Sequence, residues 1–120
     1  MRQELMGRAM AEKMAKTAYD DPLMEDFADR TREAVFGLLW TRPGFDVKVR
    51  ALITVISDTA TAAWPELRIY PRMALNQGWT EAELGEALLH TAGYIGAPSV
   101  REALLVAREV FAEMRAEAAE

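Results

Sequence analysis

Cysteine is absent from this 120-residue chain, and histidine occurs once, as His90. Without a thiol the protein can form no disulfide, thiolate metal site, CxxC redox pair or cysteine nucleophile. A transition-metal centre would have to rest mainly on carboxylates, and no run of carboxylates has the spacing of a metal-binding loop. No glycine-rich phosphate turn follows a strand, so we expect neither flavin nor nicotinamide. The sequence therefore predicts a protein that works without a metal or cofactor.

Basic charge and long apolar runs are also scarce. The chain carries 14 Lys and Arg against 19 Asp and Glu, a formal net charge of -5. This balance argues against nucleic-acid binding, which needs clustered cations. No stretch approaches the roughly 20 apolar residues of a membrane span, and the start, MRQE, lacks the apolar core of a secretory signal. We therefore expect a cytoplasmic protein with no nucleic-acid or membrane partner.

What the chain does contain is helical periodicity. With 51% hydrophobic residues, it is expected to form one all-α domain over residues 1–120, with about six helices and residues 1–19 as an N-terminal helical arm. The expected helices cover residues 3–17, 22–40, 47–63, 64–76 and 80–95, and a last helix opens at Pro98 or Ser99 and carries apolar residues as far as Phe111. Local signals mark several ends: an N-cap and proline at Asp21 and Pro22, a capping box from Thr80 to Glu83, and Gly78 at a left-handed C-cap.

A polar stripe interrupts the most apolar of these helices. Arg50, Thr54, Asp58 and Thr61 stand about one turn apart in the segment 47–63, which is otherwise suited to burial. Buried polar groups need partners. The stripe must therefore face solvent or a subunit interface, form hydrogen bonds internally, or line a pocket.

The segment 64–76 combines charged pairs with a proline. Glu66 and Tyr70 stand at positions i and i+4, and so do Arg68 and Arg72. Pro71 lies inside the expected helix. A proline there removes a hydrogen bond and kinks the helix, at a cost of about 3 kcal/mol if nothing compensates. The kink could open space for a ligand beside Tyr70, or it could be a packing bend.

The single histidine lies in the expected helix 80–95. Glu86, His90 and Tyr94 follow one another at steps of four residues. A carboxylate one turn before a histidine can fix its tautomer and raise the pKa of the imidazole, as an acid-base group requires. The alternative is a hydrogen-bonded structural histidine.

Three segments considered together indicate a family. They read LWTRPGFD at 39–46, ELRIY followed by ALNQGWT between 66 and 80, and LLHTAGYIGAP at 88–98. In order and spacing they resemble the carboxymuconolactone decarboxylase family, its γ-carboxymuconolactone decarboxylase branch rather than its peroxidase branch. The resemblance runs from about residue 20 to 112. It implies an all-helical protein that forms a homotrimer or homohexamer and acts on a small-molecule substrate.

Two departures from the family pattern are visible. The CxxCxxxH motif of the peroxidase branch would fall on Ala63, Glu66 and Tyr70, so alkylhydroperoxidase chemistry is not available. The decarboxylase branch reads ELRLH where this chain reads ELRIY. Tyr70 therefore stands at the position of the family's active-site histidine, whereas the residues that match the branch are Glu66, Arg42, Arg50 and His90.

The resemblance implies a cofactor-free decarboxylation, in which the substrate itself must accept the electron pair. The protein then has to hold the carboxylate, stabilise an oxyanion and reprotonate carbon. Arginine can fork onto a carboxylate, a tyrosine hydroxyl can donate to an oxyanion, and His90 ordered by Glu86 can move a proton. The candidate catalytic residues are Tyr70, His90 and Glu66. The candidate substrate-binding residues are Arg50, Arg42 and Trp40.

Three functions fit these residues. The first is a carboxy-lyase acting on a small carboxylated lactone or related oxo-acid. The second is an isomerase or cyclase of a related lactone or polyketide-like substrate, which manages an enolate without releasing CO₂. The third is a non-catalytic helical oligomer that uses the polar stripe as an interface. CO₂ release separates the first two, and a pocket in which Tyr70 and His90 converge separates both from the third.

Overall fold

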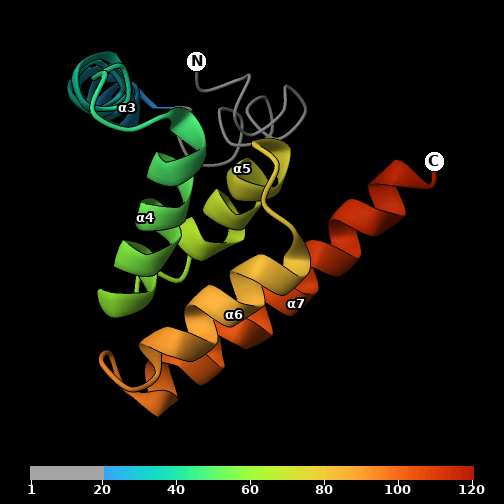
Figure 1. The fold of residues 1–120 in the computed structure, drawn as a ribbon. Helices are drawn as coiled ribbons and strands as arrows, with labels where there is room; N and C mark the ends of the chain where they lie inside the picture. The colour runs from blue at the N-terminus through green and yellow to red at the C-terminus, as the bar shows by residue number, and fades with distance from the viewer. Residues whose placement is uncertain (1–20) are drawn as a thin grey trace. The chain divides into compact units, whose positions relative to one another are not determined.

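The computed structural model describes residues 21–120, and every regular element in that range is helical. Figure 1 shows their course along the chain. The elements are α3 (Pro22–Thr31), the π-helix η1 (Arg32–Leu39), α4 (Val47–Ala60), the 3-10 helix η2 (Glu66–Arg68), α5 (Tyr70–Asn76), α6 (Glu81–Thr91) and α7 (Ala97–Ala118). The all-α prediction is confirmed. The expected N-terminal arm, residues 1–19, lies outside the described residues.

The described residues divide into two compact units, and the boundary along the chain lies between Val47 and Lys48. The prediction of one domain over residues 1–120 stays a prediction. The first unit begins as expected: the Asp21 carboxylate accepts a hydrogen bond from the backbone N–H of Met24 at 2.8 Å, and Pro22 occupies the first turn of α3. Here the local signal was sufficient, because a cap needs only its own neighbours.

The continuation of this first helix differs from the prediction. A single α-helix was expected to reach Trp40. From Arg32 onward, however, the helix follows the π pattern, in which a backbone N–H donates to the carbonyl five residues earlier. The N–H of Trp40, for example, donates to the carbonyl of Val35 at 3.0 Å. The indole of Trp40 is buried and stacks on Phe36 with ring centroids 5.5 Å apart. π-Helical turns are rare and are not encoded by a simple periodic pattern. Hydrophobic spacing therefore could not anticipate this segment.

In the second unit α4 buries one face. Ala51, Val55 and Thr59, spaced at steps of four, are fully buried, whereas Ile53 is exposed. The near-continuous apolar surface of this helix is thus only partly used within the unit. The start of α4 is fixed to the loop after α5 because the indole N–H of Trp79 donates to the carbonyl of Lys48 at 2.6 Å.

The segment 64–76 is not the kinked helix that the sequence suggested. It forms η2, breaks at Ile69, and restarts as α5 with Pro71 in the first turn. A proline in the first turn costs no hydrogen bond because that N–H would have no helical partner. The expected kink at Pro71 is therefore wrong, and the proline is a buried helix start. Gly78 after α5 has φ of 108° and confirms the expected left-handed position.

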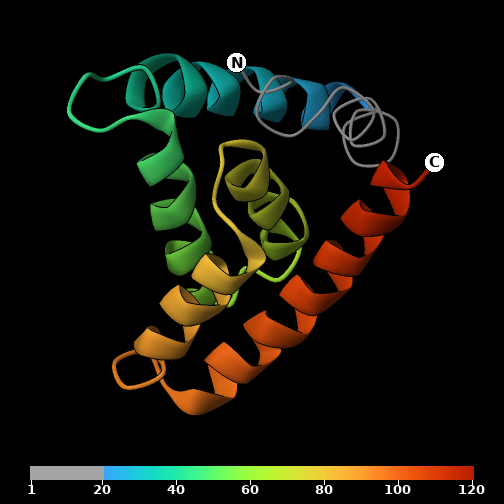
Figure 2. The same cartoon turned by 45° about the vertical axis from the view of Figure 1, so that its right-hand side comes forward.

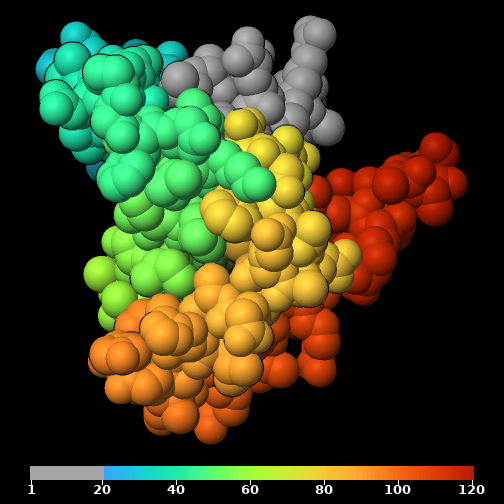
Figure 3. All heavy atoms as spheres, viewed as in Figure 1, coloured from blue at the N-terminus to red at the C-terminus, as the bar shows by residue number. Residues whose placement is uncertain are grey.

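The helices α6 and α7 form an antiparallel pair, which is visible side by side in Figures 1 and 2. The capping box is confirmed: the N–H of Glu83 donates to the hydroxyl of Thr80 at 3.0 Å, and the N–H of Thr80 donates to the Glu83 carboxylate at 2.9 Å. These bonds lower the pKa of Glu83. Figure 3 shows α6 in front of the first part of α7, whose last turns extend beyond it.

The core of the second unit is built around α7, which also contacts η2 and α5. Its fully buried apolar side chains include Leu67, Met73, Leu84, Leu88, Val100 and Val110. Two arginines reinforce the contact with α7. Arg72 is only 5% exposed and its guanidinium meets Glu117 at 2.8 Å and Glu113 at 2.9 Å, while Arg68 meets Glu109 at 2.7 Å.

Candidate functional site

The polar stripe of α4 resolves into satisfied hydroxyls and one unsatisfied carboxyl. The hydroxyl of Thr54 donates to the carbonyl of Arg50 at 2.8 Å, and that of Thr61 donates to the carbonyl of Ser57 at 3.0 Å. Asp58 differs, because its Oδ2 is buried and has no hydrogen-bond partner among the described residues. A buried polar oxygen without a partner is uncommon in folded proteins. Asp58 is therefore the exceptional group on this helix.

Glu66 of η2 lies close enough to Asp58 to act on it electrostatically. Burial of the Asp58 carboxyl, and secondly the negative charge of Glu66, raise its pKa from 3.8 to about 7. Both causes favour the protonated form, since burial disfavours the anion and a like charge repels it. At neutral pH Asp58 is thus poised between carboxylic acid and carboxylate.

A strained turn carries the chain from Asp58 back to Glu66. Ala62 adopts a left-handed conformation with φ of 56°. The N–H of Ala63 donates to the carbonyl of Asp58 at 2.8 Å, and that of Ala62 donates to the carbonyl of Thr59 at 3.3 Å. This is the Schellman pattern of helix ends, usually made by glycine. An alanine there costs about 1 kcal/mol, so the sequence maintains this turn against a local preference.

Tyr70, at the start of α5, is half-buried and follows Glu66 by one short helical turn and a break. The expected i,i+4 relation between the two side chains on one α-helix is not present, because η2 is a 3-10 helix and ends before Tyr70. Arg50 is half-buried on α4, two turns before Asp58. Three consecutive elements, α4, η2 and α5, therefore carry Arg50, Asp58, Glu66 and Tyr70.

His90 occupies a different environment near the end of α6. Its ring is exposed and contacts the ring of Tyr94, with centroids 5.5 Å apart. No hydrogen bond or ion pair within residues 21–120 joins His90 to Glu86 or to Glu66. The carboxylate that was expected to order the imidazole does not do so, and an aromatic contact takes its place. The expected catalytic role of His90 stays a prediction.

Trp40 and Arg42 belong to the first unit. Trp40 is buried beyond η1, and Arg42 is exposed in the turn that follows, where its backbone N–H donates to the carbonyl of Leu39 at 3.2 Å. Trp40 and Arg42 thus both belong to the WTRPG turn, which is one of the motifs that carry the family resemblance. Their expected role in substrate binding stays a prediction.

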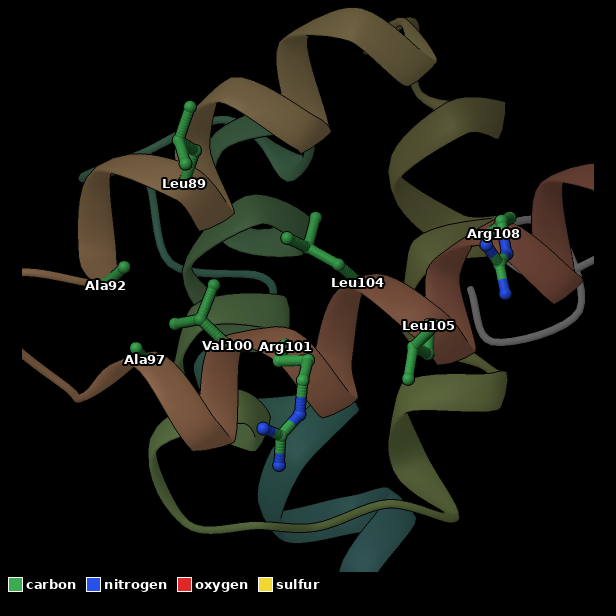
Figure 4. A pocket seen from close by; sticks show the side chains of 8 residues that line it. All are labelled: Leu89, Ala92, Ala97, Val100, Arg101, Leu104, Leu105 and Arg108. Carbon is green, nitrogen blue, oxygen red and sulfur yellow. The ribbon is translucent and has the colours of Figure 1, made fainter.

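A cavity of about 410 Å³ opens between α6 and α7. Its lining is apolar except for two arginines, as Figure 4 shows, and consists of Leu89, Ala92, Ala97, Val100, Arg101, Leu104, Leu105 and Arg108. It includes none of the six residues predicted for the site. This hollow therefore does not bring Tyr70 and His90 together.

The described part of the chain contains no group of three or more His, Cys, Asp and Glu side chains able to hold a metal ion. In the same range, no helix has the length and apolarity needed to span a membrane. The chemistry available around α4, η2 and α5 is that of carboxyl, guanidinium and phenol groups. Such groups can bind an anion, donate to an oxyanion and transfer a proton.

Asp58 is the residue that sequence reasoning noticed but did not place in the site. Its position in a polar stripe on an apolar helix was the signal. The deciding facts are its buried oxygen and the nearby Glu66. They depend on the turn at Ala62, which no periodic pattern encodes.

Comparison with known proteins finds one family and several similar proteins. The profile of the carboxymuconolactone decarboxylase family matches residues 25–109. A nitrosuccinic acid decarboxylase from Metarhizium robertsii is 35% identical over 114 residues, which span 95% of this chain and 78% of the relative. A 4-carboxymuconolactone decarboxylase from Acinetobacter baylyi is 31% identical over 114 residues, which span 95% of this chain and 84% of the relative. An uncharacterized 15.0 kDa protein of Paracoccus denitrificans is 36% identical over 83 residues, 68% of this chain and 62% of its own length.

Proposed function

The chain belongs to the carboxymuconolactone decarboxylase family, and from this premise we propose that it is a cofactor-independent carboxy-lyase acting on a small carboxylated lactone or a related acid. The observation that carries the proposal is the similarity over 95% of the chain to two proteins named as decarboxylases. Their names point to substrate acids with an electron sink near the carboxyl group, a conjugated lactone in one and a nitro group in the other. A sink of this kind removes the need for a cofactor.

Each proposed residue has a role in this reaction. Arg50 binds the substrate through a carboxylate, because guanidinium and carboxylate form paired hydrogen bonds. Tyr70 donates its phenolic hydrogen to the oxygen on which negative charge develops as CO₂ leaves. A phenol with an ordinary pKa near 10 is suited to donate a hydrogen bond rather than to shuttle protons at neutral pH.

The remaining site residues complete the proposal. Glu66 supplies negative charge beside Asp58, and the exposed His90 moves protons between the site and solvent. Arg42 and Trp40 contribute further contacts to substrate from the WTRPG turn. Because Tyr70 replaces the family's histidine, we expect a substrate that depends more on oxyanion stabilisation than on a histidine acid-base group.

We also propose that the protein acts as a homotrimer or homohexamer. Large apolar side chains remain exposed in the second unit, among them Leu89, Leu105 and Ile53. The first two lie in the open cavity between α6 and α7, and a neighbouring subunit would remove such side chains from water. Sedimentation at micromolar concentration tests this proposal, and a well-folded monomer would contradict it.

The decisive experiment for the reaction is a CO₂-release assay. Purified protein is incubated with 4-carboxymuconolactone and, separately, with nitrosuccinate, and both CO₂ and the organic product are measured. We expect release from at least one of them at a rate that a chelator and a thiol-blocking reagent leave unchanged. Conversion of a substrate without CO₂ would favour the isomerase or cyclase alternative. An inert protein would favour the non-catalytic oligomer.

A further inference from the structure

We propose that Asp58 is a further catalytic residue: a half-buried carboxylic acid on α4 that delivers its proton to the substrate carbon after CO₂ has left. The inference rests on the proposed carboxy-lyase function and adds to it the source of the proton. Of the six residues predicted from the sequence, only His90 was assigned a proton transfer, and it is exposed.

The geometry around Asp58 is that of a group held ready for an external partner. Its Oδ2 is buried and unpartnered in the described part of the chain, whereas the hydroxyls of Thr54 and Thr59 donate to carbonyls of the same helix. No ion pair within residues 21–120 reaches Asp58. An oxygen that gives up water without gaining a protein partner costs free energy. Such an arrangement is explained when the oxygen has a ligand or substrate to meet.

The neighbouring turn holds this arrangement in place. The carbonyl of Asp58 accepts the N–H of Ala63, and the left-handed Ala62 directs the chain so that Glu66 returns toward the end of α4. Strained backbone of this kind is concentrated at functional sites. The two carboxyl groups, which come from successive elements joined by this turn, are close enough to interact electrostatically.

The protonation state suits the role. Burial and the charge of Glu66 raise the pKa of Asp58 to about 7, so a substantial fraction carries a proton at neutral pH. A general acid works best when its pKa lies near the working pH, because it is then both protonated and able to release the proton. An exposed aspartate with an ordinary pKa would be almost entirely ionised.

The proposed step balances without an oxidant or a reductant. The bond between the substrate carbon and its carboxylate carbon breaks, CO₂ leaves, and the electron pair stays on the substrate as a dienolate or nitronate. The O–H bond of Asp58 then breaks as a C–H bond forms on the substrate. Asp58 is left as a carboxylate, and water restores its proton with release of hydroxide, which CO₂ can take up as bicarbonate.

The test compares Asp58→Asn with wild type on whichever of 4-carboxymuconolactone and nitrosuccinate the wild type decarboxylates. Because the acid must be protonated, wild-type kcat/KM should fall as pH rises above about 7. Asp58→Asn keeps the size of the side chain and removes the acid. We expect a loss of kcat on the order of 100-fold or more and no fall of kcat/KM around that pH. Asp26→Asn, on the exposed surface of α3, is the matched control and should behave as wild type.

A second variant keeps Asp58 in place. Glu66→Gln removes the charge that repels the Asp58 anion but leaves the burial, so the fall of kcat/KM should move to lower pH while remaining visible. The Asp58 carboxyl can also be followed without turnover by carbon-13 NMR titration, assigned by its loss in Asp58→Asn. We expect titration near pH 7 in wild type and at lower pH in Glu66→Gln.

The outcomes separate the two proposals. A wild type that releases no CO₂ from either acid overturns the proposed function and this inference with it. A wild type that releases CO₂ while Asp58→Asn keeps its kcat and pH profile overturns the inference alone. An NMR titration of Asp58 at its ordinary value, or a profile that Glu66→Gln leaves unmoved, also overturns it.

Discussion

Two regions of the 48–120 unit treat buried charge in opposite ways. The buried Arg72 of α5 meets two glutamates of α7, and Arg68 of η2 meets a third in an exposed pair. At the junction of α4 and η2, Asp58 and Glu66 place like charges near each other, and within residues 21–120 no cation pairs with either. The first arrangement compensates charge and secures packing. The second leaves charge uncompensated, as reactive groups require.

Because of this contrast, variants of the two regions should separate activity from stability. Changes to the candidate site residues on α4, η2 and α5, such as Asp58 and Tyr70, should act mainly on turnover and on its pH dependence. Changes at the α5–α7 contact should act mainly on the free energy of unfolding.

The largest effect is expected at Tyr70. Tyr70→Phe retains the ring and deletes the phenolic donor, so turnover should fall on the order of 100-fold, as for loss of one oxyanion donor. The free energy of unfolding should change by no more than about 1 kcal/mol, the net contribution of one hydrogen bond. Steady-state CO₂ release and thermal unfolding measure the two quantities.

The matched control for this prediction is Tyr94→Phe, because Tyr94 is 82% exposed and its ring contact with His90 survives the change. It should leave turnover within about twofold, since it deletes only an exposed hydroxyl. Full activity of Tyr70→Phe on the true substrate would remove Tyr70 from the catalytic residues. We further expect Tyr70→His to raise CO₂ release from a γ-carboxylated butenolide, because it restores the family's side chain.

Arg72 should give the largest loss of stability in the opposite region. Arg72→Met removes a buried guanidinium from Glu113 and Glu117, whose carboxylates are about half exposed and can rehydrate. We therefore expect a loss of about 2 kcal/mol, below the 3–5 kcal/mol of a fully buried pair. Arg68→Met, which breaks an exposed pair, should cost less than about 1 kcal/mol. Equal losses in urea unfolding would show that burial does not distinguish the two arginines.

Asp58 should make stability depend on pH. Its pKa of about 7 in the folded protein exceeds the ordinary 3.8, so between these values the folded state binds the proton more tightly than the unfolded chain. Stability should be highest below about pH 4 with respect to this group and should decrease as pH rises to about 7. Because the side chain is only partly buried, solvent screening limits the change to about 1–2 kcal/mol.

Asp58→Asn isolates this contribution. The difference in unfolding free energy between wild type and the variant should vary with pH over that window and become constant above it. Urea unfolding at a series of pH values measures it. A difference that stays flat from pH 4 to 7 would mean that the carboxyl is not perturbed in the folded protein.

The smallest effect is expected at the turn. Ala62→Gly relieves the left-handed strain at φ of 56° but increases the freedom of the unfolded chain, so a net gain of about 0.5 kcal/mol is expected. Ala112→Gly, at an exposed position inside α7, should instead cost about 1 kcal/mol. A destabilised Ala62→Gly, seen as a lower Tm, would show that the side chain of Ala62 makes contacts that outweigh its strain.

The features that could be predicted from the sequence are those determined by near neighbours. The cap at Asp21, the capping box at Thr80 and the left-handed Gly78 each depend on a few adjacent residues, and all three are confirmed. Pro71 was located correctly within a helical region, but its role as a helix start depended on the break at Ile69. The spacing of apolar residues does not record that break, and η2 before it contacts α7, which is distant in the sequence.

The candidate site was harder to predict because its chemistry depends on contacts between elements. The polar stripe correctly drew attention to Asp58, yet nothing in the pattern said that its oxygen would be buried or that Glu66 would act on it. The pairing of Arg72 with Glu113 and Glu117 spans more than 40 residues of sequence. Such relations are decided by tertiary packing, whereas the family resemblance suggested which side chains to follow.

The π-helix η1 has a consequence for how the first unit can change length. Its backbone hydrogen bonds join residues five apart rather than four apart. The segment Arg32–Leu39 therefore has more residues per turn than an α-helix. Removing one residue there would let the segment continue α3 as ordinary α-helix, with its backbone bonds intact. This stretch is therefore a place where a single-residue deletion could be absorbed. The deletion would also rotate Trp40 about the helix axis relative to α3. The indole at the start of the WTRPG turn would then point in a different direction.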